Sequence, residues 1–273
     1  MALADLVAEV VERNGGTVLK RTESSIVATV QPVLASGASG PEYGVEVSCK
    51  GGRPSAKEFG TAILPTWCPE RHINADGTFC LYWEEEEPLA FATLDDVALW
   101  WGKVLIFLGR QGTAKRLRRW PGKGDARAHG ADAARAQDKA ERAAMVLGPG
   151  FVADLRDGRL TSVASRKGGH HRVRLFRNGC RIASVDRQTK KVLTLRSRCR
   201  CAEAARTRLP LASCGEHAHA LSTLALALEQ WSQAEANFFA YFARCGRECC
   251  GTIDGCPLAV LEPTREFQQR KAA

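Results

Sequence analysis

The chain has 273 residues, 45% of them hydrophobic and 25% charged, which fits a globular protein of one or two domains and excludes a collagen-like or disordered chain. Residues 1–112 contain 9 Lys and Arg against 15 Asp and Glu, a net charge of −6, whereas the remainder contains 30 against 15, a net charge of +15. This split predicts two parts with different roles. The basic part would meet nucleic acid or an acidic protein, or only present a solvated cationic surface.

The sequence predicts no membrane association. No apolar window reaches the length of about 20 residues that a membrane span requires, and the first residues lack the basic start of a secretory signal. We therefore expect a cytoplasmic protein whose eleven cysteines stay reduced. Such cysteines are buried thiols, metal ligands or a nucleophile rather than a disulfide scaffold.

The first part reads as an α+β domain. An amphipathic helix is predicted over residues 2–13, where apolar side chains recur at helical spacing. Four strand-like runs follow between Gly- and Pro-rich breaks and predict an antiparallel meander: residues 17–20, 25–30, 43–49 and 59–64. An irregular stretch over residues 65–88 leads to a second helix, which begins near Thr93 with Asp96 completing a capping box.

A Gly-Pro-Gly sequence after an Ala-rich helix predicts the domain boundary. The helix spans residues 131–147, so the expected domains are residues 1–147 and residues 151–273. The second is predicted to be a smaller, cysteine-rich α+β domain.

The expected elements of this second domain are short strands and one long helix. The strands are predicted at residues 151–156, 173–176, 180–185 and 192–195. Asn178-Gly179 predicts a hairpin turn. The helix is predicted from about Cys214 to Cys245, with a capping box from Ser213 and Glu216.

The most informative stretch runs from Phe59 to Leu81, FGTAILPTWCPERHINADGTFCL. It places Cys80 eight residues after His72 and six after Asn74. A nucleophilic cysteine is expected on a loop carried by a rigid scaffold, whereas a structural thiol more often lies on a strand or helix face. Cys68 is expected to be packed, the alternatives being a second reactive thiol or a partner in a reversible disulfide.

The order helix, meander, His-x-Asn, Gly-x-x-Cys-Leu and helix resembles the ubiquitin-conjugating-enzyme fold over residues 1–112. The lead-in Cys-Pro-x-Arg-His-x-Asn, with the later Trp120 and His129-Gly130, is similar to bacterial members associated with antiphage defence operons. The resemblance implies a transferase that forms a thioester on Cys80 with the C-terminus of a ubiquitin-like protein or a tailed nucleotidyltransferase-type partner. An activating enzyme would supply the acyl group, a lysine of a target would receive it, and the transfer would require no cofactor.

The resemblance also assigns roles to the neighbours of Cys80. Asn74 would support the loop and donate to the tetrahedral oxyanion, and His72 would brace the loop. Ile73 stands where the family has proline, and the Asn74-to-Cys80 spacing is about two residues short. These departures keep open a second hypothesis, a catalytically inactive adaptor in a defence complex. The acidic run Glu84–Glu87 would attract an incoming lysine or simply be solvated.

Eight of the eleven cysteines lie in the second half, a clustering that favours a structural metal such as Zn²⁺ over buried thiols alone. A straight helix of this length separates Cys214 from Cys245 by about 45 Å, so they cannot share an ion. Two separate candidate sites remain: Cys199, Cys201, Cys214 and His217, or Cys245, Cys249, Cys250 and Cys256.

The basic second half of the chain, residues 151–273, supports a third hypothesis, nucleic-acid binding. A basic run beside Trp120 is a further signal, in which the indole would stack on a base. The run consists of Arg116, Arg118, Arg119, Lys123 and Arg127. A solvated connector is the favoured interpretation, so nucleic acid is a possible partner but not the expected one.

Overall fold

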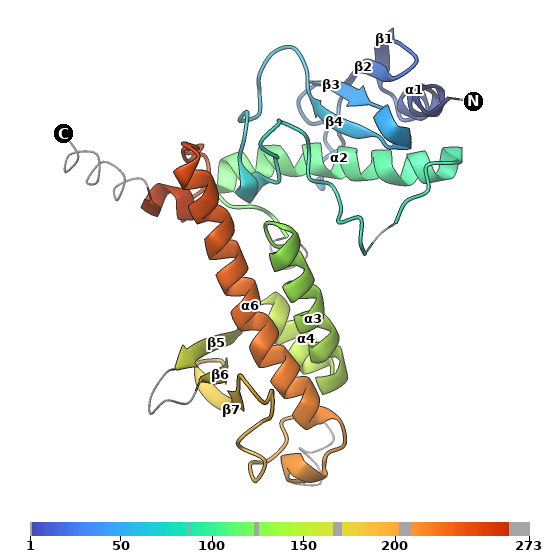
Figure 1. Ribbon diagram of the computed structural model, residues 1–273. Helices are drawn as coiled ribbons and strands as arrows, with labels where there is room; N and C mark the ends of the chain where they lie inside the picture. Colours follow the sequence, from blue (N-terminus) through green and yellow to red (C-terminus); the bar gives the residue numbers. More distant parts are fainter. Residues whose placement is uncertain (1, 87, 123–125, 166–170, 202–208, 262–273) are drawn as a thin grey trace, which may run out of the picture. The chain divides into compact units, whose positions relative to one another are not determined.

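The computed structural model describes residues 2–86, 88–122, 126–165, 171–201 and 209–261 (Figure 1). The chain divides into two compact units. Unit 1 comprises Met1–Pro121 together with the segment that begins at Arg247, and unit 2 comprises Gly122–Gly246. The predicted boundary at residues 148–150 therefore falls inside unit 2, and the end of the chain returns to unit 1.

Unit 1 is built on a four-stranded antiparallel sheet with the strands in chain order, which confirms the predicted meander. Its elements are α1 (Leu3–Arg13), β1 (Thr17–Arg21), β2 (Ser25–Val30), β3 (Tyr43–Ser48), η1 (Lys50–Gly52), β4 (Ser55–Glu58), η2 (Pro69–Arg71) and α2 (Leu94–Leu117). The fourth strand ends before the predicted run of residues 59–64. The last ladder bond is donated by the Phe59 amide to the Gly44 carbonyl, and Gly60 then takes a positive φ of 83° that turns the chain away.

The core of unit 1 lies on one face of this sheet. Residues at every second position of β2 and β3 are buried, among them Ile26 and Val45, and they form one cluster with the apolar faces of α1 and α2. Trp100 and Trp101 of α2 are completely buried there. The predicted capping box is confirmed, because the Thr93 hydroxyl accepts from the Asp96 amide and the Asp96 carboxylate accepts from the Thr93 amide.

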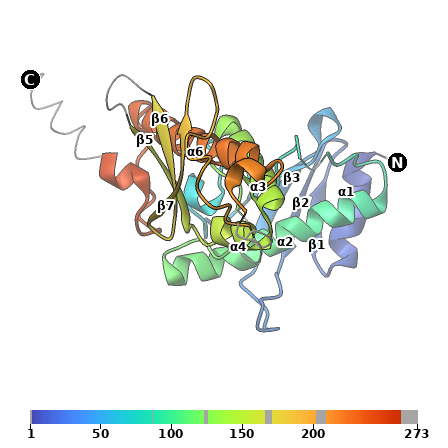
Figure 2. The ribbon, with the colours of Figure 1, turned by 90° about the horizontal axis from the view of Figure 1, so that it is seen from below.

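In its described residues, unit 2 combines the helices α3, α4 and α6 with a three-stranded antiparallel sheet in the order β5-β6-β7 (Figure 2). Its elements are α3 (Ala131–Leu147), α4 (Pro149–Arg156), β5 (Leu160–Ser165), β6 (Arg172–Arg177), β7 (Cys180–Asp186), η5 (Leu211–Ser213) and α6 (His217–Arg244). The hairpin turn at Asn178-Gly179 is confirmed, since both residues have positive φ between β6 and β7.

Three local predictions in unit 2 are wrong. Residues 151–156 form the helix α4 because Pro149 starts a helix directly after Gly148, with no strand partner beside it. Residues 192–195 do not form a strand, since Val192 makes only an isolated bridge to Val185. The helix α6 begins at His217 with Glu216 as its N-cap residue, so Ser213 does not cap it.

The packing of α3 against α6 explains why unit 2 begins before α3 and not at residues 148–150. The small side chains on one face of α3, including Ala140 and Ala144, belong to the same buried cluster as Leu221 and Leu224 of α6. The helix α6 also contacts all three strands of the second sheet. Residues 148–150 are thus only the corner between α3 and α4. None of the helices in the described part of the chain has the length and apolar content of a membrane span.

Candidate functional site

Cys80 closes a tight backbone hairpin that begins at His72. The Cys80 amide donates to the His72 carbonyl oxygen at 2.8 Å, and Ile73 pairs with Phe79 as an isolated antiparallel bridge. The Phe79 amide donates to the Ala56 carbonyl oxygen of β4 at 2.8 Å, which ties the hairpin to the edge of the sheet. The site cysteine is therefore held on a loop that is fixed by backbone hydrogen bonds.

Cys80 itself is exposed at the surface of unit 1, as a nucleophile on this loop requires. The preceding residue, Phe79, is buried in the core of unit 1 and anchors the hairpin to that core. Protein atoms that crowd around the sulfur raise the pKa of the Cys80 thiol, because they disfavour the charged thiolate. Cys80 is thus exposed at the surface with a sulfur that protein atoms surround closely, and the thiol form dominates near neutral pH.

Asn74 stabilises the turn of the hairpin. Its amide nitrogen donates to the Thr78 hydroxyl at 3.0 Å, and its own backbone N–H donates to the Thr78 carbonyl oxygen at 2.8 Å. Gly77 supplies the positive φ of 82° that this short turn needs, and the Asp76 carboxylate accepts from the Thr78 amide. The side chain and the backbone of Asn74 are therefore both hydrogen-bonded to Thr78 across the turn.

His72 packs against an aromatic ring rather than standing free in solvent. Its imidazole lies 5.0 Å from the indole of Trp120, and its backbone has a left-handed φ of 56°. Burial, helped by the charge of Arg110, lowers the pKa of His72 to about 4. A histidine that stays neutral at physiological pH and is held by Trp120 braces the loop.

The protonation of His72 is testable by NMR. We expect its ring resonances to titrate with a midpoint at a pH of about 4 in the folded protein. In urea-unfolded protein the midpoint should return to the ordinary histidine pKa of about 6.5. Folding favours the neutral form of His72. The contribution of His72 to the free energy of unfolding is therefore complete above a pH of about 6.5, and it is lost as the pH falls toward about 4. A folded-state midpoint near 6.5 would contradict the packing described here.

A buried arginine connects the site loop to α2. Arg71 is only 2% exposed, and its Nε donates to Gln111 Oε1 at 2.8 Å. In return, Gln111 Nε2 donates to the Arg71 carbonyl oxygen at 3.0 Å. Burial lowers the pKa of the guanidinium but leaves it charged. This reciprocal pair fixes the backbone immediately before His72. Arg71 is part of the Cys-Pro-x-Arg-His-x-Asn sequence, but nothing in the sequence showed that its side chain is buried on Gln111.

The acidic run after Cys80 is solvent-exposed in its described part. Glu84, Glu85 and Glu86 are all exposed, and Glu84 forms an ion pair with Arg53. Glu87 lies outside the described residues. The run thus places negative charge within a few residues of the site cysteine, where it can interact with a cation from solvent.

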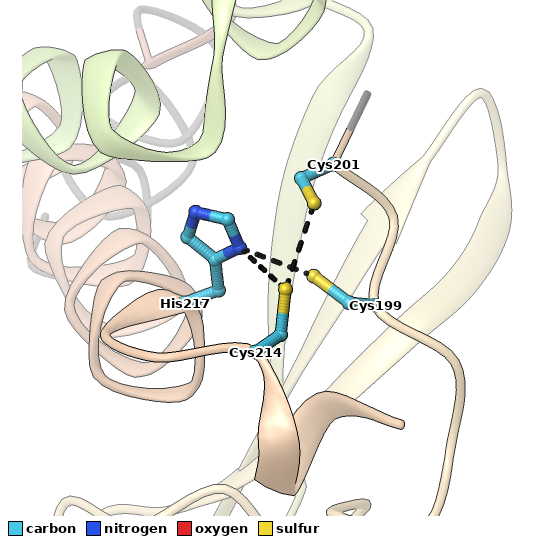
Figure 3. Close-up of side chains that lie close together, drawn as sticks. All are labelled: Cys199, Cys201, Cys214 and His217. Atoms are coloured by element: carbon cyan, nitrogen blue, oxygen red, sulfur yellow. Dashed lines mark hydrogen bonds between the residues drawn. The ribbon is translucent and has the colours of Figure 1, made fainter. Parts of the chain in front are cut away.

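Unit 2 brings together the first of the two predicted sets of metal ligands (Figure 3). The ligand atoms of Cys199, Cys201, Cys214 and His217 all lie within 4.8 Å of one another. His217 Nδ1 lies 3.1 Å from Cys214 Sγ and 3.4 Å from Cys199 Sγ, and Cys201 Sγ lies 3.7 Å from Cys214 Sγ. A tetrahedral zinc site has S···S separations of about 3.8 Å and S···N separations of about 3.6 Å, so the four side chains fit that ion.

The electrostatics of this cluster also favour a cation. Desolvation, followed by the hydrogen bonds to Cys199 and Cys201, raises the pKa of the Cys214 thiol to about 12. Three thiolates cannot share this small space without a compensating charge, whereas a divalent cation deprotonates the thiols that coordinate it. The cluster is therefore compatible with a bound structural metal ion.

The second predicted set is not assembled. Among the described residues, the Cys199 cluster is the one group of three or more such side chains that comes within 4.8 Å of each other. Cys245 is exposed at the end of α6, while Cys250 Sγ lies 2.9 Å from Cys68 Sγ and Cys256 interacts with Cys249. The sequence-based prediction grouped these four cysteines because they are close in sequence. In the structure Cys245 belongs to unit 2, whereas Cys249, Cys250 and Cys256 belong to unit 1.

The predicted basic run is partly engaged within the protein. Trp120 lies against Phe107, at a ring separation of 6.0 Å, as well as against His72. Arg118 pairs with Asp254, and Arg127 pairs with Glu141. Lys123 lies outside the described residues. An indole that is packed between two rings does not present the open face that base stacking needs.

Two family models match the chain. Residues 14–122 match the prokaryotic E2 domain, and residues 128–258 match the cysteine-rich domain that lies C-terminal to the E2 domain. No curated protein and no solved structure matches the chain at a significant level. The junction between the two matches agrees with the end of the first stretch of unit 1 at Pro121.

Proposed function

We propose that this member of the prokaryotic E2 family, which carries the family's C-terminal cysteine-rich domain, is a ubiquitin-conjugating-type transferase. Cys80 would be its acyl carrier. The family supports an E2-like conjugating function. The single observation that carries the assignment to Cys80 is its position, exposed at the end of a hydrogen-bonded hairpin on the edge of the sheet.

The reaction follows from thiol chemistry. The Cys80 thiolate attacks the carbonyl carbon of a thioester on an activating enzyme, a new thioester forms on Cys80, and the activating enzyme's thiolate leaves. A lysine amine of the target then attacks the same carbonyl carbon. An amide forms, the Cys80 thiolate leaves, and the amine's proton passes to solvent. The donor would be a ubiquitin-like protein or a tailed nucleotidyltransferase-type partner, and the setting would be antiphage defence.

The neighbours of Cys80 would act by positioning. The Asn74–Thr78 hydrogen bond and the neutral, packed His72 hold the hairpin in one conformation, which keeps the sulfur in a fixed place for both attacks. The exposed carboxylates of Glu84 and Glu85 would raise the local concentration of a target lysine.

The test is an adduct assay with the full chain, ATP, an activating enzyme and its ubiquitin-like donor. We expect an adduct that survives denaturant and is removed by dithiothreitol. Cys80→Ala should abolish it completely, and Cys80→Ser should give an oxyester that resists dithiothreitol. The matched control is Cys180→Ala, which removes another exposed cysteine, at the start of β7, and should leave the adduct unchanged.

Two results would decide against this assignment. An unchanged adduct in Cys80→Ala would remove Cys80 from the mechanism. A stable complex with the donor that needs no ATP and persists in Cys80→Ala would favour the inactive adaptor.

We also propose that Cys199, Cys201, Cys214 and His217 hold a structural Zn²⁺ ion in unit 2. The support is the fit of the donor set: three sulfurs and one imidazole nitrogen that all lie within 4.8 Å of one another. Four protein ligands leave no open position for substrate, so the ion would stabilise the fold rather than take part in acyl transfer.

A further inference from the structure

Two sulfur atoms from distant parts of unit 1 lie in contact. The Sγ atoms of Cys68 and Cys250 lie 2.9 Å apart and share a hydrogen bond, although 182 residues separate the two in sequence. Cys68 is 1% exposed, whereas Cys250 is partly exposed. A disulfide bond is about 2.05 Å long, so the two sulfurs need to approach by less than about 1 Å to form one.

The chain around Cys250 is anchored to unit 1 on both sides. On the N-terminal side, Arg247 Nη2 donates to the Ala75 carbonyl oxygen at 3.1 Å. On the C-terminal side, the buried Arg71 donates to the Thr252 hydroxyl at 3.3 Å, and the Asp254 amide donates to the Arg118 carbonyl oxygen at 2.8 Å. These contacts fix the position of the segment on unit 1, and they thereby hold Cys250 Sγ beside Cys68 Sγ.

Apolar packing reinforces this arrangement. Ile253, from the same segment, shares a small buried cluster with Cys68 and with Ala114 of α2. Trp120 and Cys250 pack against that cluster. Because Ile253 is buried and removal of apolar surface from water stabilises a fold, the segment is held on unit 1 by more than polar contacts.

We propose that Cys68 and Cys250 are a peroxide-sensitive thiol pair, which forms a reversible disulfide that ties the C-terminal segment to the loop preceding Cys80. The inference does not depend on acyl transfer, since the bond would form whether or not Cys80 is charged with a donor.

The chemistry balances with a hydroperoxide as oxidant. The Cys250 thiolate attacks one peroxide oxygen, the O–O bond breaks, and Cys250 sulfenic acid and hydroxide form. The Cys68 thiol then attacks the Cys250 sulfur, an S–S bond forms, the S–O bond breaks, and water leaves. Peroxide is reduced by two electrons and the two thiols are oxidised by two. Cellular or added thiols reverse the bond by exchange.

The two sulfurs are suited to different steps. Cys250 is the one that solvent reaches, and its sulfur shares a hydrogen bond with Cys68 and contacts the Thr252 hydroxyl at 3.0 Å. These bonds lower the pKa of Cys250 to about 5, while the same contact raises that of Cys68. The thiolate is therefore on the accessible partner, and the buried thiol lies behind it as the resolving group.

A metal ion fits this pair less well than a disulfide. Within the described residues, no third ligand atom joins the pair closely enough to make a group within 4.8 Å, in contrast to the cluster in unit 2. The hydrogen bonds that Cys68 and Cys250 make go to each other and to neighbouring hydroxyl or backbone groups. Two sulfurs alone do not complete a tetrahedral site.

The experiment is peptide mapping of the full-length protein after brief treatment with a low concentration of hydrogen peroxide, without reductant. Trypsin should release a linked pair of peptides that begin at Glu58 and Glu248, two hydrogen atoms lighter than their sum. Fragmentation should place the bond between Cys68 and Cys250, and dithiothreitol should separate the peptides. Cys250→Ser should abolish the linked pair, and the matched control Cys249→Ser should keep it.

The intermediate provides an independent readout. In Cys68→Ser, which lacks the resolving thiol, Cys250 should accumulate as a sulfenic acid that dimedone traps. Linkage of Cys250 to any other cysteine, or no linked peptide at peroxide levels that oxidise exposed Cys180, would overturn the proposal. So would a second equivalent of zinc in the untreated protein that is lost in Cys250→Ser.

Discussion

Replacing Cys214 by alanine is expected to remove bound zinc from the protein and to unfold the part of unit 2 around it. Cys214 contacts His217 and Cys201, so its loss leaves an incomplete site with three ligands. Structural zinc contributes about 10–16 kcal/mol in peptides that fold only around the ion. Unit 2 has its own apolar core, so we expect a loss of several kcal/mol, on the order of 3–5, from its free energy of unfolding.

The measurement is metal content together with limited proteolysis. The unmodified protein should hold one zinc per chain and resist cleavage between residues 209 and 216, whereas Cys214→Ala should hold none and be cleaved there. His217→Ala should behave in the same way. The control Cys180→Ala, which removes an exposed cysteine outside the cluster, should retain the metal. Full zinc content in Cys214→Ala would rule out this ligand set.

Replacing Gln111 by leucine is expected to destabilise unit 1 strongly. The Gln111 side chain is completely buried and accepts from Arg71 Nε, so leucine would leave a buried guanidinium without its main acceptor. Removing the partner of a buried charge costs about 3–5 kcal/mol. The carbonyl oxygen of Arg71 would also lose the bond from Gln111 Nε2.

A double-mutant cycle separates the buried charge from packing. Arg71→Met in the Gln111→Leu background replaces the unpaired buried guanidinium by an uncharged side chain of similar length. The double variant should therefore recover part of the stability, measured by urea unfolding. Lys115→Met on the exposed face of α2 serves as the control and should change stability by less than about 0.5 kcal/mol. If the double variant is as unstable as the sum of the singles, the two side chains do not act as a pair.

The periodic elements of unit 1 could be predicted from the sequence because their signals are local. Alternation in β2 and β3, the Asn14 stop after α1 and the Thr93–Asp96 capping box depend on residues within a few positions of each other. Cys80 could be singled out as the candidate acyl carrier for the same reason, since His72, Asn74 and Cys80 lie on one hairpin. The Cys199, Cys201, Cys214 and His217 set is also compact in sequence, within 19 residues.

The errors have equally local causes. The stretch from Phe151 to Arg156 has strand-like residues, and a helix forms there because Pro149 fixes the φ angle of a first helical turn. The Gly-Pro-Gly sequence marks a real break between α3 and α4, but whether a break separates two domains depends on what packs across it. Here the Ala-rich face of α3 is covered by α6, so both stay in one unit.

Sequence alone determined the meander, the helices that cover it, the exposed loop cysteine and the cysteine-rich character of the second part. Only the tertiary structure decided that the end of the chain returns to unit 1, that Arg71 is buried on Gln111, and that Cys250 meets Cys68 rather than Cys245. The physical reason is distance along the chain: these contacts join residues 40 to 182 positions apart. Their partners are selected by burial and packing in three dimensions, which no spacing rule over neighbouring residues contains.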